Sequence, residues 1–424
     1  MSNVIQLPRP RRLRPSPARI GYYLRVGRND HKEVASRLAE GERAYSGLVF
    51  DAHNVERHRE LIAAAATYGL DAVLDTRSQQ AAFVGGYSNS LGKLPWGLGR
   101  QSAIGDFRGA EGQRRAEEIA TFAEEHGISA VLAPTHLISS ANDPWFAADR
   151  AVATRLKAQL PRQSALFYSL ALPFQLLRNT EERGAIVEAL RSVDMDALWI
   201  KVENFGADAS GEKVRAFVNA SQDFHQLGVP VVVDHAGGLP GLATLAFGAT
   251  GGIAHGIMMF ESFKASAWRH PRGGTPRVPA PRVYLQGLDM LVAKDQASNL
   301  LEHSLRVRGQ HACRDPRCCP RGYRDMVEHP ARHYCYSRAR QVEMLSSTPI
   351  GGRASAFMDE MVRPRSDALA AAATLPLTDE KLVASLAKRH LAMGRFRGAL
   401  ADMTENFEPL TVAQCPLSRQ QREE

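Results

Sequence analysis

No stretch of 18 apolar residues occurs in the 424-residue sequence, so we expect no transmembrane helix. The first 19 residues, MSNVIQLPRPRRLRPSPAR, carry charge but no apolar core, so they do not resemble a secretory signal and we expect a cytoplasmic protein. Cysteine is also scarce, with five residues, four of them between positions 313 and 335. In a cytoplasmic protein, clustered cysteines are more often metal ligands than disulfides.

Acidic residues are outnumbered, because 53 Lys and Arg against 45 Asp and Glu give a net charge of +8 and a pI of about 9.3. Part of this excess lies in residues 1–19, a proline-rich segment that we expect to be a disordered basic arm. A second part surrounds the cysteines and comprises Arg306, Arg308, Arg314, Arg317, Arg321, Arg324, Arg332, Arg338 and Arg340. We expect it to contact the phosphates of DNA or tRNA; an ordinary solvated surface is the alternative.

Eight short apolar segments recur along the chain, each followed by a helix-like segment. They cover residues 20–26, 46–51, 71–75, 128–133, 165–170, 196–202, 229–234 and 251–256. Strands that alternate with helices favour a parallel sheet, and continuous rather than alternating apolar character suits strands buried on both faces. Eight units predict an α/β fold closed into a (β/α)8 TIM-type barrel over residues 20–265, with an open doubly wound sheet as the alternative.

The pattern changes after the barrel. Residues 266–348 form a post-barrel segment that holds the Cys/His cluster, and residues 349–424 form a C-terminal helical region and tail. We expect helices over 286–306, over 331–345, and from Thr378 to about residue 406. The sequence thus predicts a barrel with a zinc-binding and helical C-terminal appendage.

Ionisable side chains follow most of the predicted strands, at the end where barrel enzymes place their reacting groups. They are Asp51, His53, Asp75, His136, Lys201, Glu203, Asp234, His235 and His255. Each alone could cap a helix or form a salt bridge, but together they predict a pocket at the barrel mouth. We assign substrate contacts to His136 and Lys201.

Two adjacent glycines, Gly237 and Gly238, precede a helix expected to begin near Pro240. Free backbone N–H groups at such a helix start can bind a phosphate, so both glycines are candidate substrate contacts. A tight turn that only glycine permits is the alternative.

The cysteine cluster reads HACRDPRCC, then thirteen residues, then HYC. Tetrahedral zinc needs four nitrogen or sulfur ligands. Cys313, one or both of Cys318 and Cys319, and His333 or Cys335 could supply them. We expect a structural Zn²⁺ site; buried free thiols or a redox pair are the alternatives.

Over about residues 45–348 the chain resembles the tRNA-guanine transglycosylase superfamily, including its DNA-modifying 7-deazaguanine relatives. The resemblance rests on AVLDTRSQQAAF, on ALFYSLALPFQLLRNTEERGAIVEAL followed by DMDALWIKVENFG, on VVVDHAGG followed by GATGGIAHG, and on cysteines followed by a helical His. It implies a barrel, a structural zinc and exchange of guanine for a 7-deazaguanine-type base in DNA or tRNA. Three features depart from the family: His255 stands where a nucleophilic Asp is expected, LALPF replaces the base-reading Gln and Gly, and the zinc spacing differs.

The first functional hypothesis is therefore a nucleic-acid-modifying transglycosylase. The resemblance implies that Asp75 contacts the base; the strand positions suggest Asp234 as nucleophile, assisted by Glu203 or His255. A barrel that has lost catalysis and serves as a nucleic-acid-binding subunit is the second hypothesis, and both are compatible with a homodimer or a partner subunit. A metal-dependent hydrolase using the strand-end Asp and His residues is the third.

Overall fold

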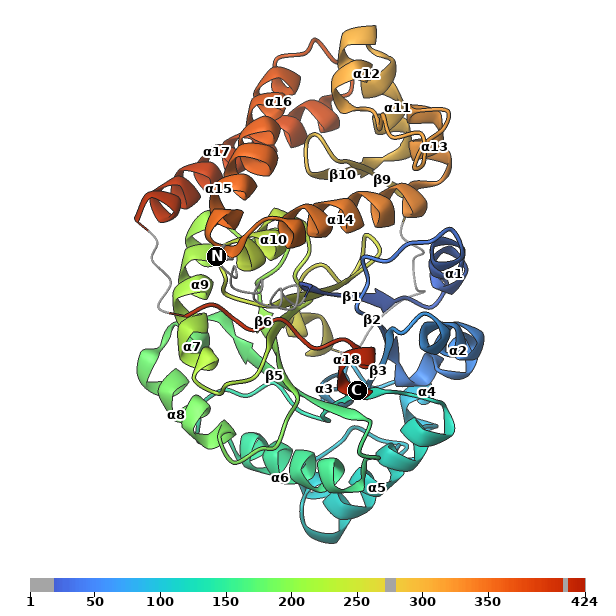
Figure 1. The fold of residues 1–424 in the computed structure, drawn as a ribbon, viewed down its shortest axis with the longest axis vertical. Coiled ribbons are helices and arrows are strands. Elements are labelled where there is room, and N and C mark those ends of the chain that lie inside the picture. The colour runs from blue at the N-terminus through green and yellow to red at the C-terminus, as the bar shows by residue number, and fades with distance from the viewer. Residues whose placement is uncertain (1–18, 271–279, 407–410, 424) are drawn as a thin grey trace, which may run out of the picture.

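The computed structural model describes residues 19–270, 280–406 and 411–423 (Figure 1), so all of the expected basic arm except Arg19 lies outside the described residues. Eight parallel strands form a closed barrel in sequence order, with β8 paired to β1. They are β1 (Gly21–Val26), β2 (Gly47–Asp51), β3 (Asp71–Asp75), β4 (Ala130–Leu132), β5 (Ala165–Pro173), β6 (Ala197–Glu203), β7 (Val231–Asp234) and β8 (Gly252–Gly256). The predicted TIM-type barrel is confirmed, and closure excludes the open sheet.

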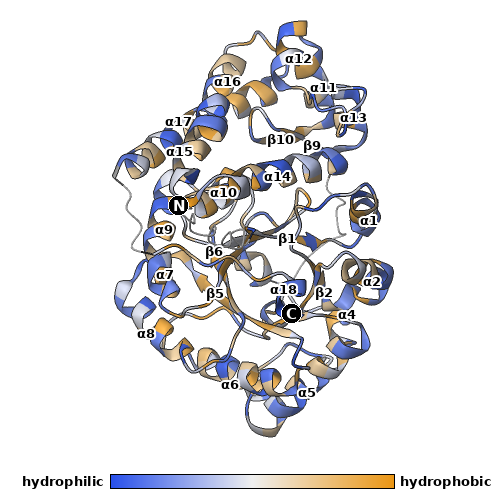
Figure 2. Ribbon diagram, in the orientation of Figure 1, coloured by the Kyte–Doolittle hydropathy of each residue, from blue (hydrophilic) through white to orange (hydrophobic). Residues whose placement is uncertain are grey.

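Helices surround this barrel, with apolar residues directed at the strands and polar residues directed outward (Figure 2). They are α1 (His31–Ala39), α2 (Arg59–Thr67), α5 (Gly109–Glu125), α6 (Pro144–Gln159), α8 (Thr180–Leu190), α9 (Gly211–His225) and α10 (Gly238–Ala246), with the short helices α3 (Ser78–Ala81), α4 (Asn89–Gly92) and α7 (Phe174–Arg178) in the loops. Among the described residues, no helix combines the length and the apolarity needed to cross a membrane.

The interior of the barrel is a separate apolar cluster that includes Tyr23, Val49, Val73, Trp199 and Val232. Side chains alternate along a strand, so the residue two positions further on each of these strands also points inward, but at the carboxyl end. Those residues are Arg25, Asp51, Asp75, Lys201 and Asp234. The packing of the core therefore fixes which charged side chains meet at the mouth.

The appendage lies on one side of the barrel, with α14 (Pro330–Ser347) between the two parts (Figure 1). It contains α11 (Lys294–Glu302), α12 (Leu305–His311), α13 (Tyr323–Glu328), α15 (Arg353–Ala356), α16 (Arg363–Ala373) and α17 (Glu380–Asn406). The helix expected over 286–306 is wrong in its first half. Residues 286–293 form the turn and second strand of an antiparallel hairpin of β9 (Arg282–Leu285) and β10 (Met290–Ala293). Pairing with RVYL makes MLVA a strand, which its own short apolar run could not specify.

A C-terminal strap, residues 411–423, crosses the amino-terminal face of the barrel and ends in α18 (Arg419–Glu423) (Figure 1). Arg422 forms an ion pair with the fully buried carboxylate of Asp71 at the start of β3. The strap backbone passes so close to Gly251 that a Cβ there would overlap the carbonyl of Gln414. The strap therefore seals the end of the barrel opposite the mouth.

Candidate functional site

Two cations and two carboxylates form a buried cluster at the barrel mouth. Arg25 donates from Nε to Asp234 Oδ1 at 2.7 Å and from Nη2 to Asp234 Oδ2 at 2.5 Å, and its Nη1 lies 2.9 Å from Asp75 Oδ2. Lys201 Nζ lies 3.3 Å from Asp75 Oδ2 and 3.6 Å from Asp234 Oδ2. The structure thus brings together three residues selected from the sequence, Asp75, Lys201 and Asp234, around Arg25, which sequence reasoning missed.

Both carboxylates are held in the ionised form. Burial alone would raise the pKa of Asp75, but Lys201 and Arg25 outweigh it and hold that pKa well below its usual value. Burial is likewise outweighed at Asp234, mainly by Arg25, so its pKa is lowered too. The Asp234 side chain is 0% exposed, and both of its oxygens accept from one guanidinium. Its geometry is that of a buried ion-pair partner and does not fit the nucleophile expected from the sequence.

The two residues expected to assist Asp234 lie elsewhere. Glu203 accepts from the Ser266 backbone N–H at 3.0 Å and from Arg269 at 3.3 Å, so it anchors the loop after β8. His255 points away from the mouth because its neighbour Ala254 faces the barrel interior. Its ring packs against Tyr22, and its Nδ1 lies 3.3 Å from the Tyr334 hydroxyl on α14.

At the start of α10, the backbone N–H groups of Gly237 and Leu239 already have acceptors within the chain. The Gly237 N–H donates to the carbonyl of Glu261 at 3.1 Å, and the Leu239 N–H lies 3.4 Å from Asp289 Oδ2. Every residue of α10 is buried. Asp289, from the turn of the β9–β10 hairpin, is thus the anion at this helix start, while Gly238 has a φ of +64° that suits the turn alternative.

His136 is tied to the outer layer and not to the mouth. Its Nδ1 lies 2.7 Å from Asp149 on α6, and its ring stacks on Trp145 with centroids 3.8 Å apart. Among the described residues, no group of His, Cys, Asp and Glu at the mouth has metal-ligand spacing. The ligand set that the hydrolase hypothesis requires is therefore not brought together there.

Strained backbone gathers at the same end of the barrel. Five non-glycine residues that follow β3, β6, β7 and β8 have left-handed φ angles: Arg77 (+58°), Asn204 (+64°), His235 (+58°), Met258 (+56°) and Phe260 (+55°). Such conformations cost free energy and cluster at functional sites, so the mouth is the part of the barrel where function is expected.

Asp51 lies beside the charged cluster at the mouth and is more exposed than Asp75 or Asp234, with 13% of its side chain exposed. It lies 3.8 Å from Arg25 Nη1 and 3.6 Å from Arg77 Nη1, distances at which no hydrogen bond fixes it. Arg25, which lies beside Asp51, could have been found from the sequence by one signal. It is the single charged residue in the apolar strand GYYLRV, at an inward-facing position.

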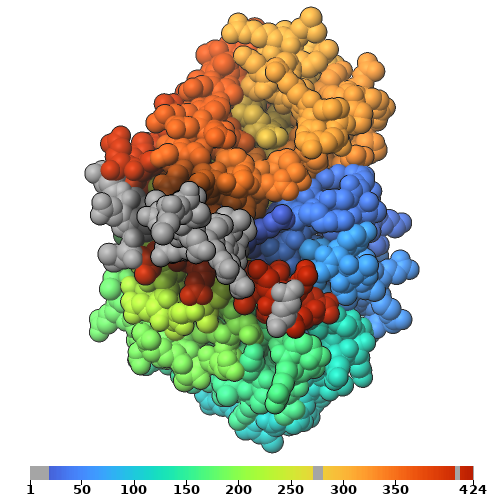
Figure 3. Space-filling model, in the orientation of Figure 1, coloured from blue at the N-terminus to red at the C-terminus, as the bar shows by residue number. Residues whose placement is uncertain are grey.

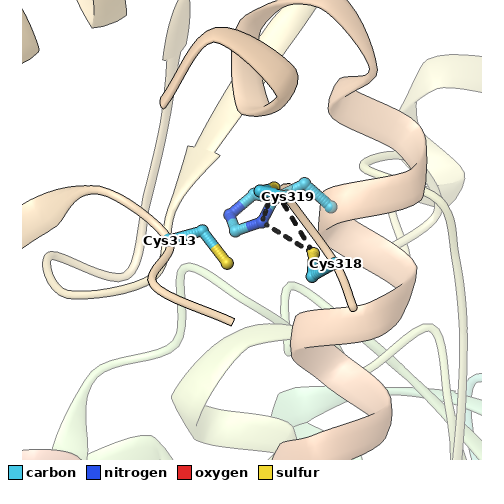
Figure 4. Close-up of side chains that lie close together, drawn as sticks. Cys313, Cys318 and Cys319 are labelled. Atoms are coloured by element: carbon cyan, nitrogen blue, oxygen red, sulfur yellow. Dashed lines mark hydrogen bonds between the residues drawn. The ribbon is translucent and has the colours of Figure 1, made fainter. Parts of the chain in front are cut away.

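Three cysteines and one histidine of the appendage have metal-ligand geometry. Figure 4 shows Cys313, Cys318 and Cys319 with their sulfur atoms directed toward one another, and His333 completes the group. Cys318 Sγ lies 3.5 Å from Cys319 Sγ and 3.4 Å from His333 Nδ1, and Cys319 Sγ lies 3.7 Å from that Nδ1. Tetrahedral zinc would place such atoms about 3.6 to 3.8 Å apart, so the donors are already spaced for an ion.

The orientation of the histidine supports the same conclusion. His333 Nε2 lies 3.0 Å from the carbonyl of Tyr284 on β9 and can donate only to it, which leaves the Nδ1 lone pair directed at the sulfurs. Cys335, which we had included among the candidate ligands, is not in this group. Two residues along a helix turn the side chain by about 200°, so Cys335 faces the first βα unit, near Glu33 and Arg37.

The arginines around the metal-ligand group divide into two sets. Arg317 forms two hydrogen bonds with Asp315, and Arg321 pairs with Asp325 and Glu328, so their charges are compensated. Arg314 and Arg324 are exposed and have no ion pair with any described residue. A surface groove of about 610 Å³, the arginine groove, is lined by Leu305, Arg308, Gly309, Ala312, Cys313, Arg314, Arg321, Gly322, Tyr323 and Arg324.

Comparison with known proteins assigns no family to this chain. No family model matches it, and no curated protein matches it. Among solved structures, it is similar to the CBM22-1–GH10 modules of Clostridium thermocellum endo-1,4-β-D-xylanase 10B complexed with xylohexaose, with a TM-score of 0.36 and 8% identity over 60% of this chain and 61% of that one. It is also similar to CbXyn10B in its native form, with a TM-score of 0.32 and 9% identity over 51% of this chain and 68% of that one. Similarity at this level carries no information about activity.

Proposed function

We propose that this protein binds nucleic acid through the arginine groove, beside a structural Zn²⁺ held by Cys313, Cys318, Cys319 and His333. The observation that carries the proposal is the charge of the groove, whose lining has four arginines and no acidic residue. Two of these arginines, Arg314 and Arg324, have no carboxylate partner among the described residues, so their charge is available to phosphates. Tyr323 adds an aromatic ring; the Arg308 guanidinium lies over it, 4.9 Å from the ring centroid, so a base would stack on the opposite face.

Zinc fits the donor set better than a hard cation would, because thiolate and imidazole are the ligands that Zn²⁺ prefers. Four protein ligands leave no open coordination position, so its role is structural. The ion would hold the segment that carries Arg314 against α14, which carries His333. Metal binding and the shape of the groove are therefore linked in this proposal.

The test is the salt dependence of binding to duplex DNA and to tRNA. For duplex DNA, the logarithm of affinity should fall with the logarithm of salt concentration, and Arg314→Ala with Arg324→Ala should reduce that slope by about 2. Arg57→Ala with Arg162→Ala removes the same charge from exposed positions of the barrel and should leave the slope unchanged. The proposal would be contradicted if the affinity of the parent protein for DNA did not change with salt, or if both double variants changed the slope equally.

Base exchange at the mouth is a second candidate, supported by the strained backbone and the convergent carboxylates. In this version Asp75 contacts the base and Asp51 attacks, because Asp234 is fully engaged by Arg25. Incubation of DNA or tRNA with the protein and labelled guanine tests it: incorporation should be abolished by Asp51→Asn, while nucleic-acid binding persists. Absence of incorporation by the parent protein would leave the binding function alone.

A further inference from the structure

A second concavity of the appendage, the appendage cavity, has a volume of about 690 Å³. Its walls come from the turn of the β9–β10 hairpin, from α12 and the segment after it, from α14 and from α16. Figure 3 shows the molecule hollowed in this region, with atoms of the hairpin visible at its floor. The cavity meets the arginine groove at Gly309 and at 312–314, but the rest of its lining is different.

Three arginines line the appendage cavity, and two of them have no ion-pair partner among the described residues. Arg340 is compensated by Glu42, whose oxygens lie 2.9 and 3.1 Å from its Nη2. Arg365 is 6% exposed and donates to the carbonyls of Gln286 and Met361, and no carboxylate of the described residues pairs with it. Arg314 is the second uncompensated cation.

The wall carboxylates do not neutralise these two cations. Asp315 is paired with Arg317 at 2.8 Å, and Asp367 lies 3.2 Å from Arg397. Arg365 is buried without a carboxylate partner, which is costly, whereas Arg314 is exposed, so an anion that enters the cavity would gain one buried and one exposed guanidinium partner.

We propose that the appendage cavity binds a small phosphate-bearing ligand of about the size of a nucleotide, at a site that shares Arg314 with the arginine groove and is otherwise lined by different charged residues. A phosphate monoester carries close to two negative charges at neutral pH and so matches two uncompensated guanidinium groups. The volume falls within the range of about 300–1,000 Å³ that small-molecule sites occupy.

The test is calorimetric titration of the full-length protein with adenosine 5′-monophosphate, inorganic phosphate and adenosine. The monophosphate should bind saturably and adenosine should not. If inorganic phosphate also binds, the phosphate group is the part of the ligand that the cavity recognises. Arg314→Ala should weaken monophosphate binding at least tenfold. Arg324→Ala, which removes a charge from the arginine groove only, should not.

A variant that leaves every charge in place gives an independent check. Ala368 lines the cavity from α16 and is half-buried, so Ala368→Phe should fill the space and abolish binding while the arginine groove still binds DNA. No saturable binding of monophosphate or phosphate by the parent protein would overturn the proposal. Equal binding of adenosine, or equal loss in the Arg314 and Arg324 variants, would also overturn it.

Discussion

Arg25→Met is the sharpest test of the charged cluster at the mouth. The change keeps most of the side-chain volume but removes both hydrogen bonds to Asp234 and the 2.9 Å ion pair with Asp75. Loss of one partner from a buried ion pair costs about 3–5 kcal/mol, and because Arg25 serves two carboxylates we expect about 4–5 kcal/mol. An unfolding entropy of about 2.1 cal/mol/K per residue over this chain converts that loss into a fall in Tm of about 5 °C.

The pH dependence of the same variant distinguishes an electrostatic loss from a packing loss. In the parent protein the low pKa of Asp234 stabilises the fold above the unfolded carboxyl pKa of about 3.9, and this contribution is lost as pH falls. Without Arg25 the largest attraction on Asp234 is gone and the weaker one of Lys201, 3.6 Å away, remains, so we expect the pKa of Asp234 to rise. Acidification would then protonate this carboxylate and reduce the loss of stability in the variant. The gap in Tm between parent and variant should therefore narrow from pH 7 to pH 5.

Calorimetry of both proteins across that pH range, with the exposed Arg57→Met as control, measures the effect. A fall in Tm below about 1 °C, or a gap that stays constant with pH, would refute the reasoning.

Three further predictions concern the metal, the hairpin and the strap. Cys318→Ser should release zinc and lower Tm, whereas Cys335→Ser should keep the zinc content of the parent by elemental analysis. Burial opposes but neighbouring arginines lower the pKa of Asp289 to about 2, so the stability it contributes is present above about pH 4 and lost toward pH 2; Asp289→Asn should remove that part of the acid sensitivity in urea titrations. Arg422→Ala leaves the carboxylate of Asp71 buried and unpaired, and should cost about 3 kcal/mol in urea unfolding.

The barrel could be predicted because each strand is buried on both faces. Such a strand appears in the sequence as a short continuous apolar run. The inward register also followed from alternation once the strands were placed, which is why Asp75, Lys201 and Asp234 converge. The partner of Asp234 could not be predicted in the same way. Arg25 lies 209 residues away on a strand that does not pair with β7, and only closure of the barrel joins them.

The zinc ligands and the glycines at the start of α10 differ in how far the local sequence could assign them. Helical phase alone separates His333 from Cys335, so that distinction was available before the structure. The role of the glycines before α10 was not, because the anion at that helix start is Asp289, from a hairpin that tertiary pairing creates. A pair of turn glycines looks the same in a sequence whether the nearby backbone N–H groups bind a ligand or a carboxylate of the same chain.

The C-terminal strap also bears on how fast the protein unfolds. Its contact between Arg422 and Asp71 spans 351 residues, so the chain must already be compact before this contact can form. Contacts of such long range are expected to be absent from the folding transition state. Weakening the strap should then leave the refolding rate almost unchanged and accelerate unfolding, so the strap acts mainly on the lifetime of the folded barrel.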